Sequence, residues 1–227
     1  TPIAMQTVSI DGEVFGKFAP QIALMLHELG HRWLAYITDV QTADGTVTLS
    51  DPIHWFGNVH APAPGAVTES MENSPMGGDY WIDNGDGTFS SPGNEFFFPP
   101  TAYSYLDLYL MGLIAPAEMP DFFVIENLEF AGFDFGGEPI WAGNRIDVTI
   151  DDVIGAAGLR QPPAGTQTQF DLGLIGIVKP GQLPSSELIT RLNGIGQAFE
   201  PQWHDATAEL STIQTDTNDI ILHHGFE

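Results

Sequence analysis

One amphipathic segment, residues 20–37, constrains the fold of this chain more than any other part of its sequence. Its apolar residues recur at steps of three and four, the spacing of one buried face of an α-helix. They are Ile22, Met25, Leu26, Leu29, Trp33 and Ile37. Pro20 suits the first helical position, where no backbone N–H is needed. The sequence therefore predicts a helix that begins at Pro20 and packs this face against a core.

Two histidines of this segment, His27 and His31, lie outside the apolar stripe. Residues four apart sit one above the other on a helix, so both imidazoles can reach a single ion. Glu28 lies on the adjacent flank, from which its carboxylate can reach a water on that ion. This HExxH pattern is typical of zinc peptidases, in which the glutamate is the general base. We therefore predict His27 and His31 as zinc ligands and Glu28 as the catalytic base.

A catalytic zinc site also needs a third protein ligand and an open position. The compact pattern HExxHxxGxxH would place glycine at position 34 and histidine at position 37. The chain has Leu34 and Ile37 there, which excludes this pattern. The third ligand must come from later in the sequence, and the candidates are His54, His60, Glu69, Glu72 and Asp107.

A family resemblance favours His54 among these candidates. The pair His54-Trp55, followed by Ser74-Pro75-Met76-Gly77-Gly78, resembles the leishmanolysin-like metzincins. The resemblance implies a zincin-like fold, His54 as third zinc ligand, Met76 in a Met-turn beneath the metal, and residues 102–113 as a helix that packs under the site. Asp107 is loosely similar to the metal-binding aspartate of aspzincins, and could instead orient a ligand or be a satisfied buried carboxylate. Glu69 and Glu72 stay open as further alternatives.

The segment Asp83-Asn84-Gly85-Asp86-Gly87 resembles the oxygen-rich start of a calcium loop. It lacks the later glutamate at EF-hand spacing, and a tight hairpin turn explains the same residues. We prefer the turn and keep Ca²⁺ as a second candidate cofactor.

Composition narrows the possible partners and ligand types. The chain has 30 Asp and Glu against 6 Lys and Arg, and its net charge of −24 repels nucleic acid. It has no cysteine, so a metal must be held by His, Asp or Glu. No apolar run approaches the ~18 residues of a membrane span, and no spanning helix is expected.

Hydrophobic patterning predicts an α+β domain built on a modest mixed sheet. The expected strands cover residues 3–10, 46–50, 79–82, 145–150 and 170–178. Further helices are expected at residues 102–113, in a short segment from Asp151, and at 184–209, where Ser185 or Ser186 can be the N-cap. Residues 1–210 would form the catalytic domain, and residues 211–227 a C-terminal tail without periodicity.

These features together predict a secreted zinc endopeptidase that acts on protein or peptide substrates. Acidity, the lack of cysteine and a start at Thr1-Pro2 without an initiator Met favour export with a leader already removed. About twenty residues precede the active-site helix, whereas zincins place a sheet before it. We therefore expect a piece of a larger precursor or assembly. The alternative is a catalytically inactive, metal-stabilised module for binding or surface assembly.

Overall fold

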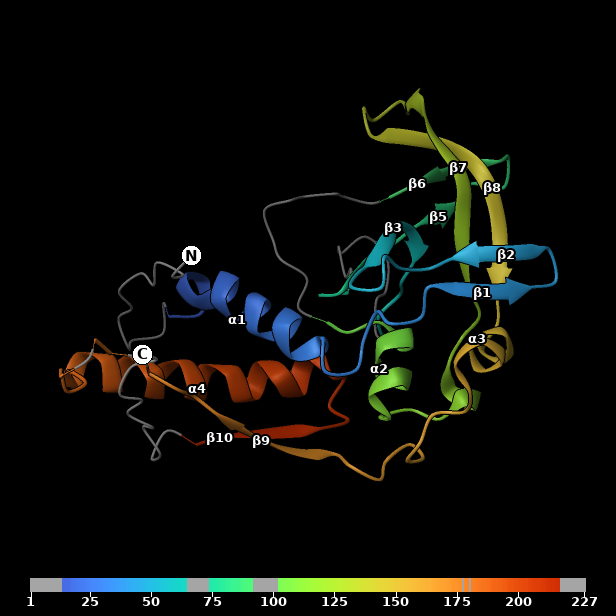
Figure 1. Ribbon diagram of the computed structural model, residues 1–227. Helices are drawn as coiled ribbons and strands as arrows, with labels where there is room; N and C mark the ends of the chain where they lie inside the picture. The colour runs from blue at the N-terminus through green and yellow to red at the C-terminus, as the bar shows by residue number, and fades with distance from the viewer. Residues whose placement is uncertain (1–13, 65–73, 92–101, 177, 180, 217–227) are drawn as a thin grey trace.

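The computed structural model describes residues 14–64, 74–91, 102–176, 178–179 and 181–216 (Figure 1). The helices of this part are α1 (Val14–Gly30), α2 (Tyr105–Met111), α3 (Ile150–Ala157), α4 (Ser186–Ala206) and the 3-10 turn Pro116–Glu118. Its strands are β1 (Asp39–Thr42), β2 (Gly45–Thr48), β3 (Trp55–His60), β4 (Gly77–Asp79), β5 (Ile82–Asp83), β6 (Thr88–Ser90), β7 (Phe122–Phe133), β8 (Pro139–Val148), β9 (Gln169–Gly173) and β10 (Thr212–Asp216). The α+β class is confirmed, and the expected strand at 3–10 falls outside the described residues.

The largest sheet has six strands in the order β4-β3-β7-β8-β6-β5. The β3–β4 pair is parallel and the other pairs are antiparallel, so the sheet is mixed as expected. Its centre is the long β7–β8 hairpin, paired from Phe122↔Val148 to Phe133↔Pro139, which extends away from the helices (Figure 1). The sequence prediction found only the end of β8 and missed β7.

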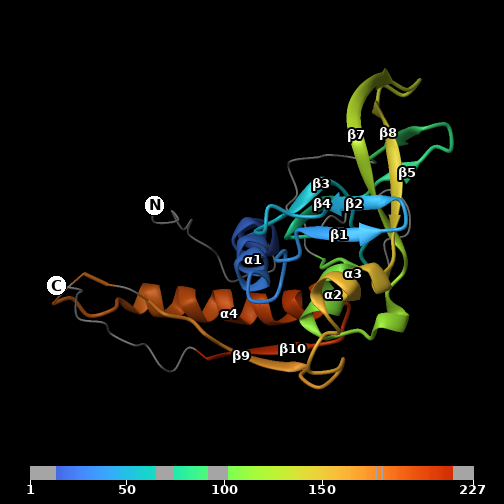
Figure 2. The same cartoon turned by 45° about the vertical axis from the view of Figure 1, so that its right-hand side comes forward.

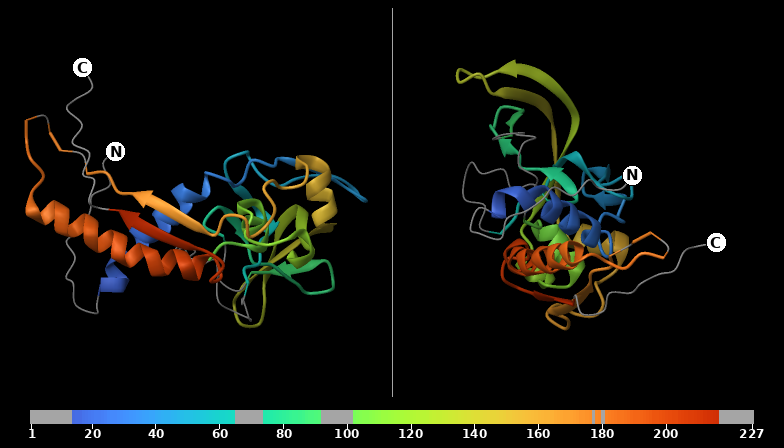
Figure 3. Two further views of the ribbon diagram at one scale, coloured as in Figure 1. Left: turned by 90° about the horizontal axis from the view of Figure 1, so that it is seen from below. Right: turned by 90° about the vertical axis from the view of Figure 1, so that its left-hand side faces the viewer.

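Beside this sheet, α4 lies between α1 and the parallel β9–β10 pair, and α2 lies near the ends of both helices (Figures 1 and 2). The view from below shows β9 and β10 running along α4 (Figure 3). Trp203 of α4 is fully buried where these layers meet. Its ring contacts the rings of Trp33, Tyr103, Phe170 and Phe199. None of the helices described here has the length and apolarity needed to cross a bilayer.

The first helix differs from the prediction at both ends. It begins at Val14 rather than Pro20, and it ends at Gly30 rather than continuing to Ile37. Hydrogen bonds from the N–H groups of Trp33 and Leu34 to the Gly30 carbonyl close the chain into a turn. Ala35 then adopts a φ of 63°, which an α-helix does not permit. His31 therefore lies in the turn directly after the helix.

The C-terminal boundary also differs. Residues 212–216 form β10, parallel to β9, and are not part of a tail that starts at 211. Ile213 is 6% exposed, and both the N–H and the hydroxyl of Thr215 donate to Glu200, at 2.7 and 2.6 Å. Ile213 is the one apolar residue of this strand, so its sequence shows no alternation of apolar and polar residues. The rest of the expected tail, 217–227, lies outside the described residues.

Several local predictions are confirmed because short-range chemistry decides them. Ser185 caps α4, accepting a hydrogen bond from the N–H of Leu188. The helix expected at residues 102–113 is present as the shorter α2, Tyr105–Met111, which Gly112 ends in the left-handed region at φ 79°. Strands β5 and β6 form the hairpin expected around residues 83–87.

Candidate metal centre

His27 and His31 lie at the C-terminal end of α1, on the side away from its buried face. Leu26 on that face is fully buried, and its carbonyl accepts a hydrogen bond of 2.6 Å from the Tyr103 hydroxyl. The two imidazole rings are half-buried, and their centroids are 4.7 Å apart. The expected common face is therefore present, even though His31 belongs to the turn that follows the helix.

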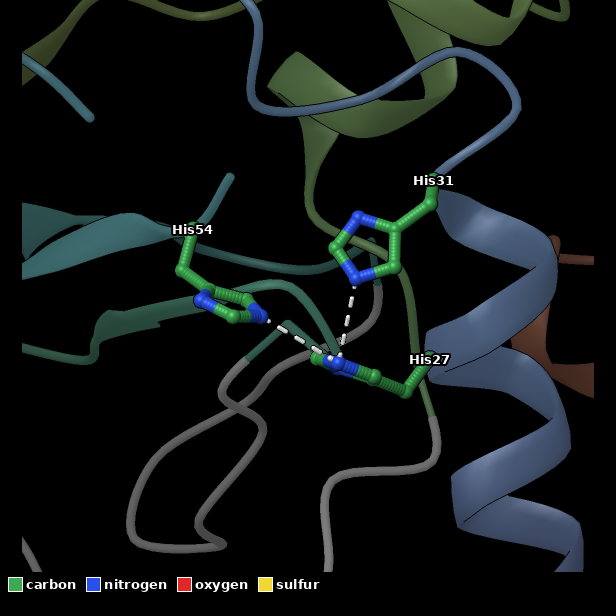
Figure 4. Close-up of side chains that lie close together, drawn as sticks. All are labelled: His27, His31 and His54. Carbon is green, nitrogen blue, oxygen red and sulfur yellow. Dashed lines mark hydrogen bonds between the residues drawn. The ribbon is translucent and has the colours of Figure 1, made fainter. Parts of the chain in front are cut away.

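His54 reaches the same place from the loop before β3. Asp51 shapes this loop, since its carboxylate accepts hydrogen bonds from the N–H groups of Ile53 and His54, at 2.8 and 2.7 Å. These bonds hold the pKa of Asp51 below its usual value. The His54 Nε2 atom lies 3.2 Å from His27 Nε2. Figure 4 shows the three imidazoles converging, one from the loop and two from the helix end.

The spacing of the three histidines fits a zinc ion. The Nε2 atoms of His31 and His27 are also 3.2 Å apart, and one nitrogen from each of the three rings lies within 4.8 Å of the others. Zn–N bonds of ~2.0–2.1 Å at tetrahedral angles place two nitrogens about 3.3 Å apart. In the described part of the chain, no fourth His, Cys, Asp or Glu joins this group.

The hydrogen bond of His27 and the lowered pKa of His31 also favour the binding of a cation. The Nδ1 atom of His27 lies 2.7 Å from the Pro75 carbonyl, which can only accept. Nδ1 therefore carries the proton, and the lone pair of His27 is on Nε2, facing the other two rings. Burial, followed by the charges of His27 and His54, lowers the pKa of His31, while Glu28 opposes this shift. A lowered pKa keeps His31 neutral and able to bind a metal at neutral pH.

Glu28 is exposed beside this group and does not belong to it. It follows His27 directly, and its charge acts on His31. An exposed carboxylate can exchange protons with water. The general-base role of Glu28 stays a prediction.

The segment around Met76 lies against the helix end that carries the histidines. Met76 is fully buried, and Pro75, the residue before it, supplies the carbonyl bonded to His27. Ser74 closes this turn, since its hydroxyl accepts from the Met76 N–H at 2.9 Å and its carbonyl accepts from Gly77 at 3.0 Å. Met76 therefore supports the site without offering a ligand to it.

The other described candidates for the third ligand, Asp107 and His60, do not belong to the group of three histidines. Asp107 is fully buried in α2, where Trp55 and Ser104 donate to its carboxylate. Burial raises the pKa of Asp107, and hydrogen bonds from Ser74, Trp55 and Ser104 oppose that rise. His60 points elsewhere, because its Nδ1 accepts from the Trp81 N–H at 3.0 Å. Glu69 and Glu72 lie outside the described residues.

The oxygen-rich loop at 83–87 forms a hairpin stabilised by its own carboxylates. Asp83 accepts from the Gly85 N–H at 2.8 Å and pairs with Arg145 at 3.1 Å. Asp86 accepts from the N–H and the hydroxyl of Thr88, at 3.0 and 2.6 Å. Through these hydrogen bonds both aspartates stabilise the turn.

Sequence reasoning missed Asp51 and the Pro75 carbonyl, which hold the ligand residues, whereas it had considered Asp107 as a carboxylate that could orient a ligand. For Asp51 a signal existed, since Asp-Pro followed by a change in pattern favours a side-chain-capped turn. A backbone carbonyl such as that of Pro75 leaves no signal in residue type.

Comparisons with protein-family models, with curated proteins and with solved structures found no match to this chain. The resemblance to leishmanolysin-like metzincins therefore rests on the residues quoted above.

Proposed function

We propose that this chain is a secreted zinc-dependent endopeptidase of zincin type. The observation that carries the proposal is the convergence of His27, His31 and His54, with 3.2 Å between Nε2 atoms and an exposed Glu28 beside them. Three imidazoles and an open position are the ligand set of catalytic zinc sites, whereas structural sites are closed by four protein ligands.

In this proposal each residue of the chain has a defined task. Zinc bound to the three histidines would supply Lewis-acid chemistry, making water a stronger acid and polarising a peptide carbonyl. Glu28 takes the proton from the attacking water and later delivers it to the leaving amine. The Pro75 carbonyl fixes the tautomer of His27 and keeps its Nε2 lone pair directed at the centre.

The exposure of the site supports a polypeptide substrate. Glu28 is exposed and the three rings are half-buried, so the open side of the centre faces solvent. The charge of −24 further favours substrates without strong negative charge. A metal-stabilised module for binding or assembly would show the same histidines but would not need Glu28, and an experiment on this residue separates the two functions.

The test is Glu28→Gln, assayed by hydrolysis of unstructured casein with and without a chelator. Glutamine keeps the size of the side chain but cannot accept the proton, so activity should fall by ~10²–10⁴-fold. Zinc content, measured by elemental analysis, should stay at one ion per chain. Glu129→Gln is the matched control, because Glu129 is an exposed carboxylate of β7 and the charge change is the same.

Two results would contradict the proposal. Chelator-sensitive activity that is equal in wild type and Glu28→Gln would remove Glu28 from the mechanism. Wild-type protein that binds zinc but hydrolyses no peptide pool would favour the binding or assembly module.

A further inference from the structure

Asp107 is a fully buried carboxylate for which the proposed mechanism has no use. It lies in the first turn of α2, where Ser104 donates to its Oδ2 atom from the backbone N–H at 2.8 Å and from the hydroxyl at 2.7 Å. These bonds cap the helix. Its Oδ1 atom is not needed for the cap and accepts a hydrogen bond from Trp55, and Ser74 also hydrogen-bonds to the carboxylate.

The first of these residues is Trp55, which follows His54 in the chain. The Trp55 indole N–H donates to Asp107 Oδ1 at 2.8 Å, and the side chain is 3% exposed. The backbone N–H of Trp55 also donates to the Met76 carbonyl, at 2.9 Å. The residue after the third ligand is thus held at both its side chain and its backbone.

The second is Ser74, whose side chain also hydrogen-bonds to Asp107. The same hydroxyl accepts from the Met76 N–H and so fixes the turn that contains Pro75. The Pro75 carbonyl in turn holds the His27 imidazole. A single buried carboxylate therefore connects the loop of His54 to the turn that orients His27.

We infer that Asp107 is a positioning residue of the metal centre. Through Trp55 and Ser74 it fixes the positions of His54 and His27 relative to each other. This inference rests on the metal centre of the proposed function. A carboxylate suits the task because it offers only acceptors to converging donors, whereas an amide would turn an N–H towards one of them. Preorganised ligands bind a metal more tightly, since less order must be created on binding.

The chain provides a matched control in Asp152 of α3. Thr149 donates to Asp152 Oδ2 from its N–H at 2.9 Å and from its hydroxyl at 2.7 Å, which repeats the cap formed by Ser104 and Asp107. Asp152 is not among the groups around the three histidines. Asp107→Ala and Asp152→Ala therefore remove the same kind of helix cap, and only the first removes the connection to the ligands.

The experiment measures zinc affinity by competition with a chromophoric chelator, and the visible absorption of the Co²⁺-loaded full chain. Asp107→Ala should weaken zinc binding by ~10–100-fold and change the Co²⁺ spectrum, as expected for groups that orient metal ligands. Trp55→Phe, which removes the N–H donor and keeps a smaller, apolar aromatic ring at this buried position, should shift both in the same direction. Asp152→Ala should shift neither.

Trp55→Phe also covers the case in which Asp107→Ala fails to fold. In the double variant of Trp55→Phe and Asp107→Ala, the fold-loss of zinc affinity should be smaller than the product of the two single losses, because both substitutions remove the same hydrogen bond. Equal zinc affinity in wild type, Trp55→Phe and Asp107→Ala would overturn the positioning role and leave the metal centre intact. Wild-type protein without zinc affinity would overturn both.

Discussion

Met76 packs directly against Gly30, the residue before the second histidine of the metal centre. A β-carbon added to Gly30 would overlap the Met76 sulfur, and the neighbouring Met76 Cγ would lie only 3.2 Å away. Both residues are buried, and Met76 is fully so. Glycine is thus required here for the close approach of a side chain, and this contact sets how far the end of α1 lies from the turn around Met76.

Gly30→Ala should therefore destabilise the protein although alanine is the better helix former. Overpacking in a buried site costs ~1–3 kcal/mol, more than the ~0.5–1 kcal/mol that alanine gains over glycine in a helix. Urea unfolding would measure the loss. The control is Gly155→Ala in α3, where an added β-carbon meets nothing within 4 Å, and this variant should be at least as stable as wild type. Stability of Gly30→Ala equal to that of Gly155→Ala would contradict the packing argument.

His54→Ala and His60→Ala should differ sharply in zinc binding. The Nε2 atom of His54 lies 3.2 Å from His27 Nε2, whereas His60 stacks on Phe123 at 4.5 Å and bonds to Trp81. Loss of a ligand should weaken zinc affinity by at least ~100-fold, beyond the usual effect of outer groups. His60→Ala should leave affinity unchanged while lowering stability. The ligand set is wrong if the two variants bind zinc equally well.

The approach of His27 and His31 to each other could be predicted from sequence because helix geometry fixes the relation between residues four apart. The approach of His54 is different, since a loop and a strand separate it from the helix. Only the resemblance carried by His54-Trp55 and Ser74–Gly78 favoured it over Asp107. Judged by residue type alone, His54 and Asp107 are equally good candidates for the third ligand.

What could not be predicted depends on partners distant in sequence. Strand β7 carries a central Asn127 at φ 53° and register shifts after Glu126, so its alternation of apolar and polar residues is broken. Gly30, where α1 ends, packs against Met76, 46 residues later. The helix periodicity that continues to Ile37 gives no sign of this contact.

Truncation after Ser211 should destabilise the chain, whereas truncation after Asp216 keeps β10. The shorter chain loses the buried side chain of Ile213 and the two donors that Thr215 offers to Glu200. Burial of one isoleucine contributes ~1.5–3 kcal/mol, so the difference between the two truncations should be at least about 2 kcal/mol. Urea unfolding of both measures it. Equal stability would mean that residues 212–216 contribute nothing and do belong to a tail.

Stability should also fall between about pH 6.5 and pH 4 because of His60. Burial, helped by the charge of Arg145, lowers the pKa of His60 from 6.5 to about 4. The unfolded chain therefore binds a proton in this window while the folded chain does not. Proton uptake by the unfolded state favours unfolding as the pH falls, with a loss of up to ~3 kcal/mol at pH 4 and none above pH 7.

His60→Asn isolates this contribution from the many carboxylates that also titrate in acid. Asparagine can place its Oδ1 near the position of Nδ1 and accept from the Trp81 N–H, but it does not titrate. The variant should be less stable than wild type at pH 7, since it loses the stacking on Phe123, and the gap should narrow steadily towards pH 4. Unfolding free energies from urea titrations at pH 7, 6, 5 and 4 would show this convergence. A gap that stays constant across the series would mean that His60 keeps an ordinary pKa in the folded protein.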